Sequence, residues 1–312
     1  MNMPLKAAGF LALADLKGIA QRTAMTGSSS FLDILFLAPG IHCQQQASEV
    51  NRGEYPTTGA MTTGYVFRVE NQATVNFLQR VGKPGYLVTV KVSPPSPHLE
   101  SFSADALAST LYIIGIAQTI TVIVALVHIR DAWALGVLAM LIIARLCNVI
   151  VVKRRAVFGW KGYPEPGVIG DLFITVSQDR WVRMRGWVDD IKAVTAGQWL
   201  REETTAESFL VTVGTLLVYG SAAVALNAST FGNALVACLL LTSLGLLGLC
   251  NALTQTQRMF GRTLHTEGEP KQYTRRLELV SELTKLHNRD DWAVTMGLIL
   301  PKKDNKGQVA VL

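Results

Sequence analysis

The chain has 312 residues, of which 49% are hydrophobic and only 17% are charged, and its formal net charge is +6. An ordinary soluble protein is less apolar and more charged. Two stretches, 106–127 and 208–257, contain no charged side chain. A buried helical hairpin in a soluble core is the alternative interpretation, but soluble helices have polar faces that these stretches lack.

The first 105 residues are expected to form a cytosolic arm with short strands and helices. Strand-like patterns occupy 64–70 and 85–92, and the helical spacing of Val75, Phe77 and Leu78 predicts a helix between them. The proline-rich stretch 93–98 reads as an extended linker. The apolar run near the start is interrupted by Asp15, so a signal peptide is not indicated, and a mitochondrial presequence is the alternative.

Four membrane spans are predicted, near 106–128, 132–152, 208–226 and 231–254. They form two helical hairpins, 106–152 and 207–254, because only short turns separate the spans of each pair. The fold class is therefore an α-helical membrane protein with four transmembrane helices and a small mixed α/β cytosolic module.

Lysine and arginine distribution predicts the orientation. Arg130 is the one lysine or arginine in either short turn. The cluster Lys153-Arg154-Arg155 and the residues Arg258 and Arg262 adjoin the opposite ends of the spans. The positive-inside rule then places both termini and the central segment in the cytosol of a multi-pass protein. The net charge is explained by this topology, so no nucleic-acid partner is inferred. The sequon at Asn227 lies in a short turn and is expected to be unoccupied.

The central cytosolic segment, 153–206, has the most distinctive sequence of the chain. Alternation over 171–185 predicts two strands followed by a helix from Val188, and a single amphipathic helix over 178–196 is the alternative. Four tryptophans lie between the second and third spans: Trp160, Trp181, Trp187 and Trp199. They indicate either contact with lipid headgroups or the core of a small domain.

The tail, 255–312, is predicted to contain an amphipathic helix and a strand. Leu277, Val280, Leu283 and Leu286 share one helical face, and 290–301 reads as a strand closed by Pro301. The arm, the central segment and the tail each lack enough apolar residues for a core alone. We therefore expect the three to form one module.

Two aspartate pairs are weak catalytic candidates: Asp189-Asp190 and Asp290-Asp291. Aspartate-rich motifs that hold diphosphate through Mg²⁺ need further carboxylates, which are missing here, so capping or solvated roles are favoured. His287 stands close to the second pair. The four cysteines lack CxxC spacing and read as packing residues. No metal or cofactor is expected.

Arg145 lies inside the second span, roughly 4–5 Å past its centre. Its side chain leans away from the nearer membrane face, which disfavours snorkelling. We expect Arg145 to face the bundle, held by polar groups of other spans or by a bound anion; Asn148, Gln118 and Tyr219 are the nearest candidates of this kind. Since no span offers a carboxylate, leucine at 145 is expected to be tolerated and glutamate is not.

The runs SQDRWVRMRGWVDDIKAVTAGQWL (177–200) and HNRDDWAVTMGLILP (287–301) resemble a family of fungal multi-pass integral membrane proteins. The resemblance covers about 100–312. It implies a fungal source and an accessory role in specialised metabolism, and it implies no activity.

Three function classes remain open. A non-enzymatic membrane scaffold or accessory protein is favoured, because complete catalytic motifs are lacking from the sequence. The alternatives are an oligomeric transporter or channel component that binds an anion at Arg145, and a membrane enzyme acting on a lipid or isoprenoid. The expected partners are the lipid bilayer, anionic lipid at the cytosolic face, and a second copy or another membrane protein.

Overall fold

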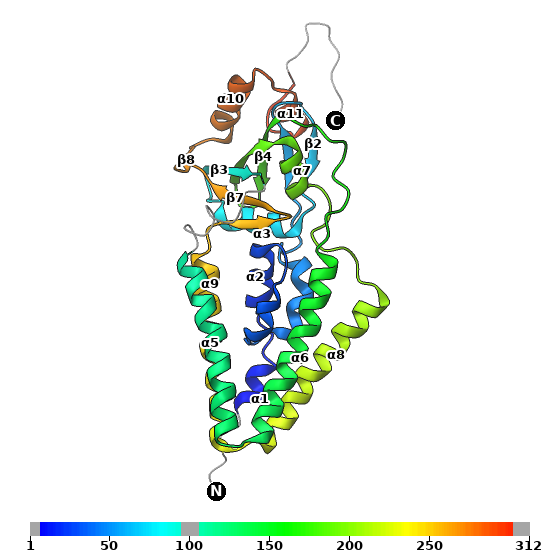
Figure 1. Ribbon diagram of the computed structural model, residues 1–312. Coiled ribbons are helices and arrows are strands. Elements are labelled where there is room, and N and C mark those ends of the chain that lie inside the picture. Colours follow the sequence, from blue (N-terminus) through cyan, green and yellow to red (C-terminus); the bar gives the residue numbers. More distant parts are fainter. Residues whose placement is uncertain (1–6, 95–105, 302–312) are drawn as a thin grey trace.

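The computed structural model describes residues 7–94 and 106–301 of the chain. A bundle of long helices carries a mixed sheet at one end (Figure 1). The short turns between the long helices lie at the opposite end. These two ends are called the sheet end and the turn end.

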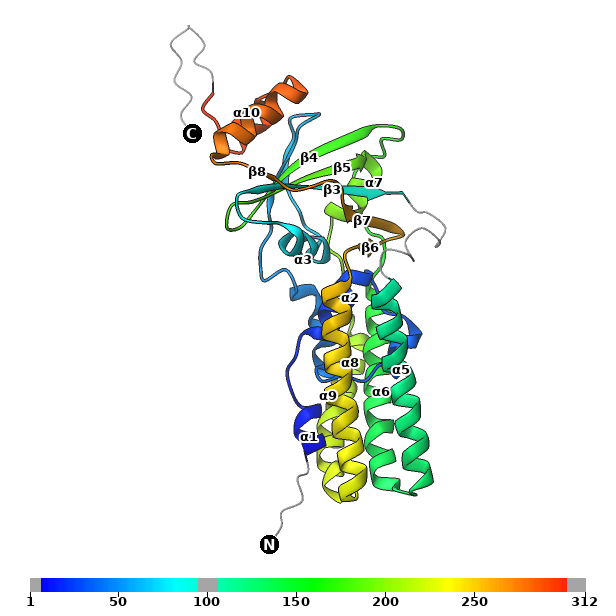
Figure 2. The ribbon, with the colours of Figure 1, turned by 90° about the vertical axis from the view of Figure 1, so that its left-hand side faces the viewer.

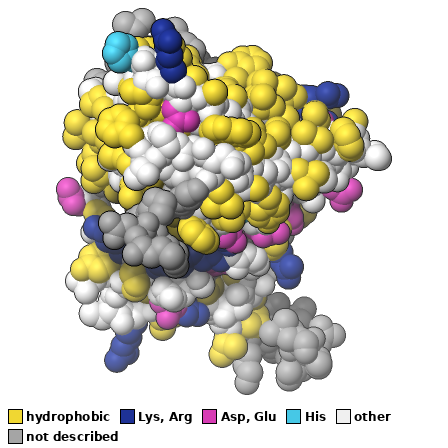
Figure 3. Space-filling model, turned by 90° about the horizontal axis from the view of Figure 1, so that it is seen from below, with side chains coloured by type: hydrophobic (Ala, Val, Ile, Leu, Met, Phe, Trp, Pro, Cys, Tyr) yellow, Lys and Arg dark blue, Asp and Glu magenta, His cyan; other side chains and the backbone are white. Residues whose placement is uncertain are grey.

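Four helices are long and apolar enough to span a membrane. They are α5 (Ala106–His128), α6 (Ala132–Arg155), α8 (Thr205–Val224, continued by the 3₁₀ turn η3, Ala225–Asn227) and α9 (Thr230–Leu253). Their bounds agree with the predicted spans to within about one turn. Many large apolar side chains on them are exposed. Figure 3, which views the turn end, shows many hydrophobic side chains with a few charged ones scattered among them.

Side-chain caps define both turns. Asp131 precedes α6 and accepts a hydrogen bond from the backbone N–H of Ala134, 3.0 Å away. Its second carboxylate oxygen accepts from the Ser229 backbone N–H, and Ser229 in turn caps α9. Asp131 is buried, which by itself favours the neutral acid, but these hydrogen bonds outweigh burial and lower its pKa. The two turns are thus tied together.

The long helices pack most closely across the two hairpins and not within them. α6 packs on α8, and α5 packs on α9, whereas the sequential partners α5 and α6 contact each other less. Figure 1 shows the two pairs diverging towards the sheet end. Amino-terminal residues lie between the pairs.

The amino-terminal residues 7–50, called the inserted segment below, run alongside the long helices. They form α1 (Ala7–Ala12), α2 (Gly18–Thr26) and the 3₁₀ helices η1 (Phe31–Leu35) and η2 (Ile41–Glu49). α1 packs on α8 and α9, α2 on α9, and η1 and η2 on α6. A tight approach occurs at Gly9, where an added Cβ would lie 2.9 Å from the carbonyl oxygen of Ala222.

The inserted segment begins at the turn end. The Ala8 backbone N–H donates to Asn233 Oδ1 (3.2 Å), and Asn233 lies in the first turn of α9. Figure 2 shows α1 low on the bundle and α2 near the sheet. The position of α1 at the turn end differs from the expectation that residues 1–105 lie on the same side of the membrane as the central segment.

The sheet unites three parts of the chain, as predicted for the module. Its order is β2-β1-β4-β5-β3-β7-β6, with β8 also paired to β3, and all pairs are antiparallel except β3 with β5. The strands are β1 (Thr57–Ala60), β2 (Val66–Arg68), β3 (Tyr86–Ser93), β4 (Ile169–Val176), β5 (Arg180–Trp187), β6 (Gln257–Met259), β7 (Arg262–Thr266) and β8 (Lys271–Gln272).

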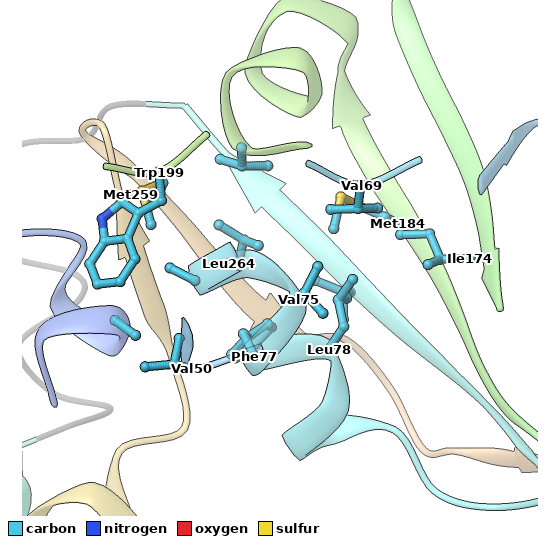
Figure 4. Close-up of a cluster of buried hydrophobic side chains, with 14 of the residues drawn as sticks. Val50, Val69, Val75, Phe77, Leu78, Ile174, Met184, Trp199, Met259 and Leu264 are labelled. Atoms are coloured by element: carbon cyan, nitrogen blue, oxygen red, sulfur yellow. The ribbon is translucent and has the colours of Figure 1, made fainter. Parts of the chain in front are cut away.

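Alternating side chains give the sheet two apolar faces. Ile174 and Met184 point to the face nearer the bundle, where α3 (Gln72–Val81) and α7 (Val188–Thr195) pack (Figure 4). Phe173 and Trp181 point to the outer face, covered by α10 (Arg276–His287) and α11 (Asp291–Thr295). The period-2 pattern of β4 and β5 therefore fills two separate cores.

The predicted helix after β2 and the two strands of the central segment are confirmed by α3, β4 and β5. The strand predicted over 290–301 is wrong. Asp291 lies in the first turn of α11, and the buried Trp292 anchors that helix on the outer face. The predicted face of α10 is also shifted, because Leu279 is buried and Leu277 is exposed.

Two of the four tryptophans between the second and third long helices have the predicted core role. Trp181 and Trp199 are buried in the two cores, and the Trp199 indole N–H donates to the backbone oxygen of Gly27 (2.7 Å) in the inserted segment. Trp160 and Trp187 are exposed.

We predict that Gly115→Ala destabilises the protein by about 1–3 kcal/mol, the usual cost of overpacking. An added Cβ would lie 2.2 Å from the ring of Phe36, which is buried and stacked on Tyr112 and so has little room to move. Thermal unfolding in detergent measures the effect.

Gly245→Ala is the matched control in α9, because nothing lies within 4 Å of its added Cβ. It is expected to be neutral or slightly stabilising, since alanine favours helix over glycine. Equal melting temperatures for the two variants would contradict the packing of Phe36 against α5.

Candidate functional site

Arg145 is buried inside the bundle, with 4% of its surface exposed. Its Nε donates to the backbone oxygen of Asp33 (3.0 Å), and its Nη1 donates to Gln44 Oε1 (2.6 Å). The side chain faces the bundle as expected. Its hydrogen-bond partners come from the inserted segment, however, and not from the other long helices.

A carboxylate also lies close to this arginine. Asp33 interacts electrostatically with Arg145, accepts a hydrogen bond from the Tyr112 hydroxyl, and accepts another from the Ser30 backbone N–H (2.7 Å). Gln44 is held in place by its own donation to Ser29 Oγ (2.8 Å). The positive charge therefore has two hydrogen-bond acceptors from the inserted segment and an opposing carboxylate nearby, which weakens the reason for placing a bound anion at Arg145.

The other intramembrane candidates do not converge on Arg145. Asn148 is buried, and its amide N–H donates to Ala144 in its own helix (3.0 Å). Gln118 donates to the Thr242 hydroxyl between α5 and α9. Tyr219 lies near His42, with 6.1 Å between the ring centroids. Asn227 is exposed in η3, beside the short turn.

The two aspartate pairs lie on opposite faces of the sheet. Asp190 accepts from Arg262 Nε (2.9 Å) on the face nearer the bundle, and its neighbour Asp189 accepts from the Glu165 backbone N–H (2.8 Å). On the outer face, Asp291 is paired with Arg289, and Asp290 immediately precedes α11. The two pairs therefore cannot line one diphosphate site.

His287 contacts a different carboxylate from the two beside it in the sequence. Its Nε2 lies 3.0 Å from Asp171 Oδ2, and the same carboxylate accepts from Arg183 Nε at 2.9 and 3.0 Å. This hydrogen bonding raises the pKa of Arg183. The group joins α10 to β4 and β5, a structural role that sequence spacing did not reveal.

A cavity of about 550 Å³ opens at the edge of the sheet module. It is bounded by β1, β2, β4, α7 and residues 160–165. Leu172 and Ile191 are buried in it, whereas Tyr65 and Trp160 are 70% and 81% exposed. Tyr65 also stacks on Phe67, with centroids 5.9 Å apart. The cavity thus has an apolar interior and an aromatic mouth.

Three cations line the same cavity: Arg68, Lys161 and Lys192. Lys192 is paired with Glu165, but among residues 7–94 and 106–301 no carboxylate lies within ion-pair distance of the other two. Lys161 donates to the backbone oxygen of Ala196 (2.9 Å). Burial, together with the nearby charge of Arg262, lowers the pKa of Lys161 to about 8.

Sequence reasoning missed this cavity. The lining residues come from four separated stretches that no sequence pattern brings together. Trp160 and Val188 were noted only as one of the four tryptophans between spans and as the start of a predicted helix. The available signal was Phe67 in β2 and Tyr65 directly before it, because residues two apart in extended backbone point to the same side.

The partners of Arg145 change the expectation for its variants. We predict that Arg145→Leu destabilises the protein by about 1–3 kcal/mol, because the Asp33 backbone oxygen and Gln44 Oε1 lose their donor and the nearby Asp33 carboxylate loses an opposing charge. Asp33→Asn should cost at least about 1 kcal/mol less in the Arg145→Leu background than in the native protein. Thermal unfolding of the two single variants and the double variant measures this coupling.

Arg154→Leu is the control on the same helix, because Arg154 pairs with Glu207. Its effect and that of Asp33→Asn should add. An additive result for Arg145 and Asp33 as well would show that the two charges are not coupled.

Comparisons of the chain with protein-family models, with curated proteins and with solved structures found no match.

Proposed function

We propose that this chain is a multi-pass membrane protein whose sheet module lies on the cytosolic side and binds an amphiphilic ligand that carries an anionic group. It acts as an accessory or scaffold protein that holds such a ligand and does not transform it. The observation that carries this proposal is the 550 Å³ cavity with its aromatic mouth and its two cations without carboxylate partners.

Membrane insertion is supported by the outer surface of the long helices. Each of the four is 23 or 24 residues long, which at about 1.5 Å per residue matches a hydrocarbon core of roughly 30 Å. Large side chains such as Ile113, Val124 and Leu216 are exposed. In water such a surface would favour aggregation, whereas in lipid it is favourable.

The orientation is supported by charge. Lys153, Arg154 and Arg155 close α6 at the sheet end, and Arg130 is the one lysine or arginine in either turn. The positive-inside rule favours a cytosolic sheet. The inserted segment begins at the turn end, so we infer that the amino terminus lies on the side opposite the sheet.

The cavity has the size and lining of a small-molecule site. Ligand pockets typically enclose about 300–1,000 Å³ and combine an apolar lining with a few polar groups. Leu172, Ile191 and Phe67 would contact the apolar part of an amphiphile. Lys161 and Arg68 would contact its anionic group, since charge-assisted hydrogen bonds are the strongest available there.

A binding role is favoured over catalysis and over anion transport for specific reasons. The catalytic candidates Asp190, Asp291 and His287 each have an ion-pair or hydrogen-bond partner. Arg145 likewise has Asp33 and Gln44. Among the described residues, Arg68 and Lys161 line the cavity without a carboxylate at ion-pair distance, although Glu70 and Glu165 line it too, so these two cations can offer charge to a ligand.

We predict that a photo-crosslinkable long-chain fatty acid labels the purified protein within this cavity. Mass spectrometry should find the label on peptides that contain Tyr65 or Trp160. Lys161→Gln should weaken the apparent affinity by about tenfold or more, the effect of losing one charge-assisted hydrogen bond. Lys271→Gln is the control, because that lysine pairs with Glu282 outside the cavity.

The same assay has a pH dependence. Because the pKa of Lys161 is about 8, its charge is present below that pH and is lost above it. Labelling should fall between pH 7 and pH 9 in the native protein and stay constant in Lys161→Arg. Labelling spread over the long helices, or unaffected by Lys161→Gln, would refute a cavity site.

Epitope tags test the topology. In sealed microsomes, protease added outside should digest a tag at the carboxyl terminus or within 161–170, because both lie in the cytosol under this proposal. A tag before Met1 should be protected until detergent is added. Digestion of all three tags without detergent would place the amino terminus in the cytosol and contradict the proposed path of the inserted segment.

A further inference from the structure

Three metal-ligating side chains meet in the inserted segment: Asp15, His42 and Cys43. One ligand atom from each lies within 4.8 Å of the other two. The Cys43 thiol donates to Asp15 Oδ1 at 2.7 Å. This group is separate from the cavity of the sheet module and from Arg145.

The backbone brings these residues together from two places in the sequence. Asp15 lies in the break between α1 and α2, whereas His42 and Cys43 lie in the first turn of η2. Gly40 has a φ of 93°, and an added Cβ there would lie 2.0 Å from the Leu16 carbonyl oxygen. A side chain at position 40 would push the segment around Leu16 away from the start of η2, so this glycine permits the cluster.

His42 has a nitrogen that is ready to bind a ligand. Its Nδ1 is buried and has no hydrogen-bond partner in the structure. A buried polar atom without a partner costs free energy, and a metal ion accepting its lone pair would remove that cost. Tyr219 packs near the ring and helps to fix its position.

The position of the cluster within the bundle adds a second reason for a cation. Gly9 packs on Ala222 near the turn end, and Gly18 packs on Leu247, which lies six residues, or roughly 9 Å, before the last residue of α9. Asp15 lies in the break between these two contacts, and its side chain is exposed. Under the proposed membrane insertion, a carboxylate at this level of the bundle is costly unless a positive charge neutralises it.

We propose that Asp15, His42 and Cys43 bind a zinc ion. Carboxylate oxygen, imidazole nitrogen and thiolate sulfur are all zinc ligands, and a thiolate disfavours the hard ions Mg²⁺ and Ca²⁺. Binding replaces the S–H proton of Cys43 by a Zn–S bond, and the proton leaves to solvent. Three protein ligands leave a fourth position open, and the exposure of Asp15 gives a path to it. This differs from the expectation that the chain holds no metal.

Cobalt titration tests the site, because Co²⁺ bound by thiolate gives a charge-transfer absorption that free Co²⁺ lacks. The full-length protein, purified in detergent and stripped with chelator, should take up one Co²⁺ per chain and release it when Zn²⁺ is added. Zn²⁺ should also protect Cys43 from maleimide, read by mass spectrometry, and release about one proton per chain.

Cys43→Ser and His42→Gln should lose the absorption, and Asp15→Asn should weaken binding at least about tenfold. The controls Cys238→Ser and His265→Gln change the same residue types outside the cluster and should bind as the native protein does. If Cys43→Ser fails to fold, protection of Cys43 in the native protein decides. A folded native protein without the absorption, or an absorption that survives both cluster variants, overturns the proposal.

Discussion

The contact between Arg145 and the inserted segment is the interaction on which the rest of the structure depends. A guanidinium buried inside the bundle needs hydrogen-bond acceptors and an opposing charge, and the described hydrogen bonds of Arg145 go to the inserted segment and not to the other long helices. Asp33 and Gln44 provide them from η1 and η2. The requirement of one side chain in α6 thus explains why an irregular stretch of backbone lies between the helix pairs.

The inserted segment in turn links the bundle to the sheet. It separates the pairs α6–α8 and α5–α9 and reaches the sheet through α2. Two buried contacts join them there: the Trp199 indole donates to Gly27, and the Gln257 amide donates to Ala24 (3.1 Å). The proposed ligand cavity and the proposed zinc site lie at different levels of this arrangement.

Sequence patterns predicted the regular elements well because their signal is local. Long apolar runs with few or no charged residues predicted α5, α6, α8 and α9, and period-2 alternation favoured strands over a helix at β4 and β5. The strand expected at 290–301 failed because Trp292 packs a short helix on the outer face, which no local pattern reports. The site was less predictable, since Arg145 meets Gln44 at a separation of 101 residues. The sequence analysis expected polar groups of other spans or a bound anion at Arg145, and no local pattern pointed to Asp33 and Gln44.

Hydrogen–deuterium exchange in detergent or lipid nanodiscs tests the central claim most directly. If the inserted segment lies between the helix pairs, amides in α2 and η2 should exchange nearly as slowly as those of α6, because they are buried or hydrogen-bonded within the bundle. Arg145→Leu should speed exchange in residues 29–45 before it affects α6. Exchange of residues 18–49 within seconds in the native protein would contradict the account, because it would place this segment free in solvent.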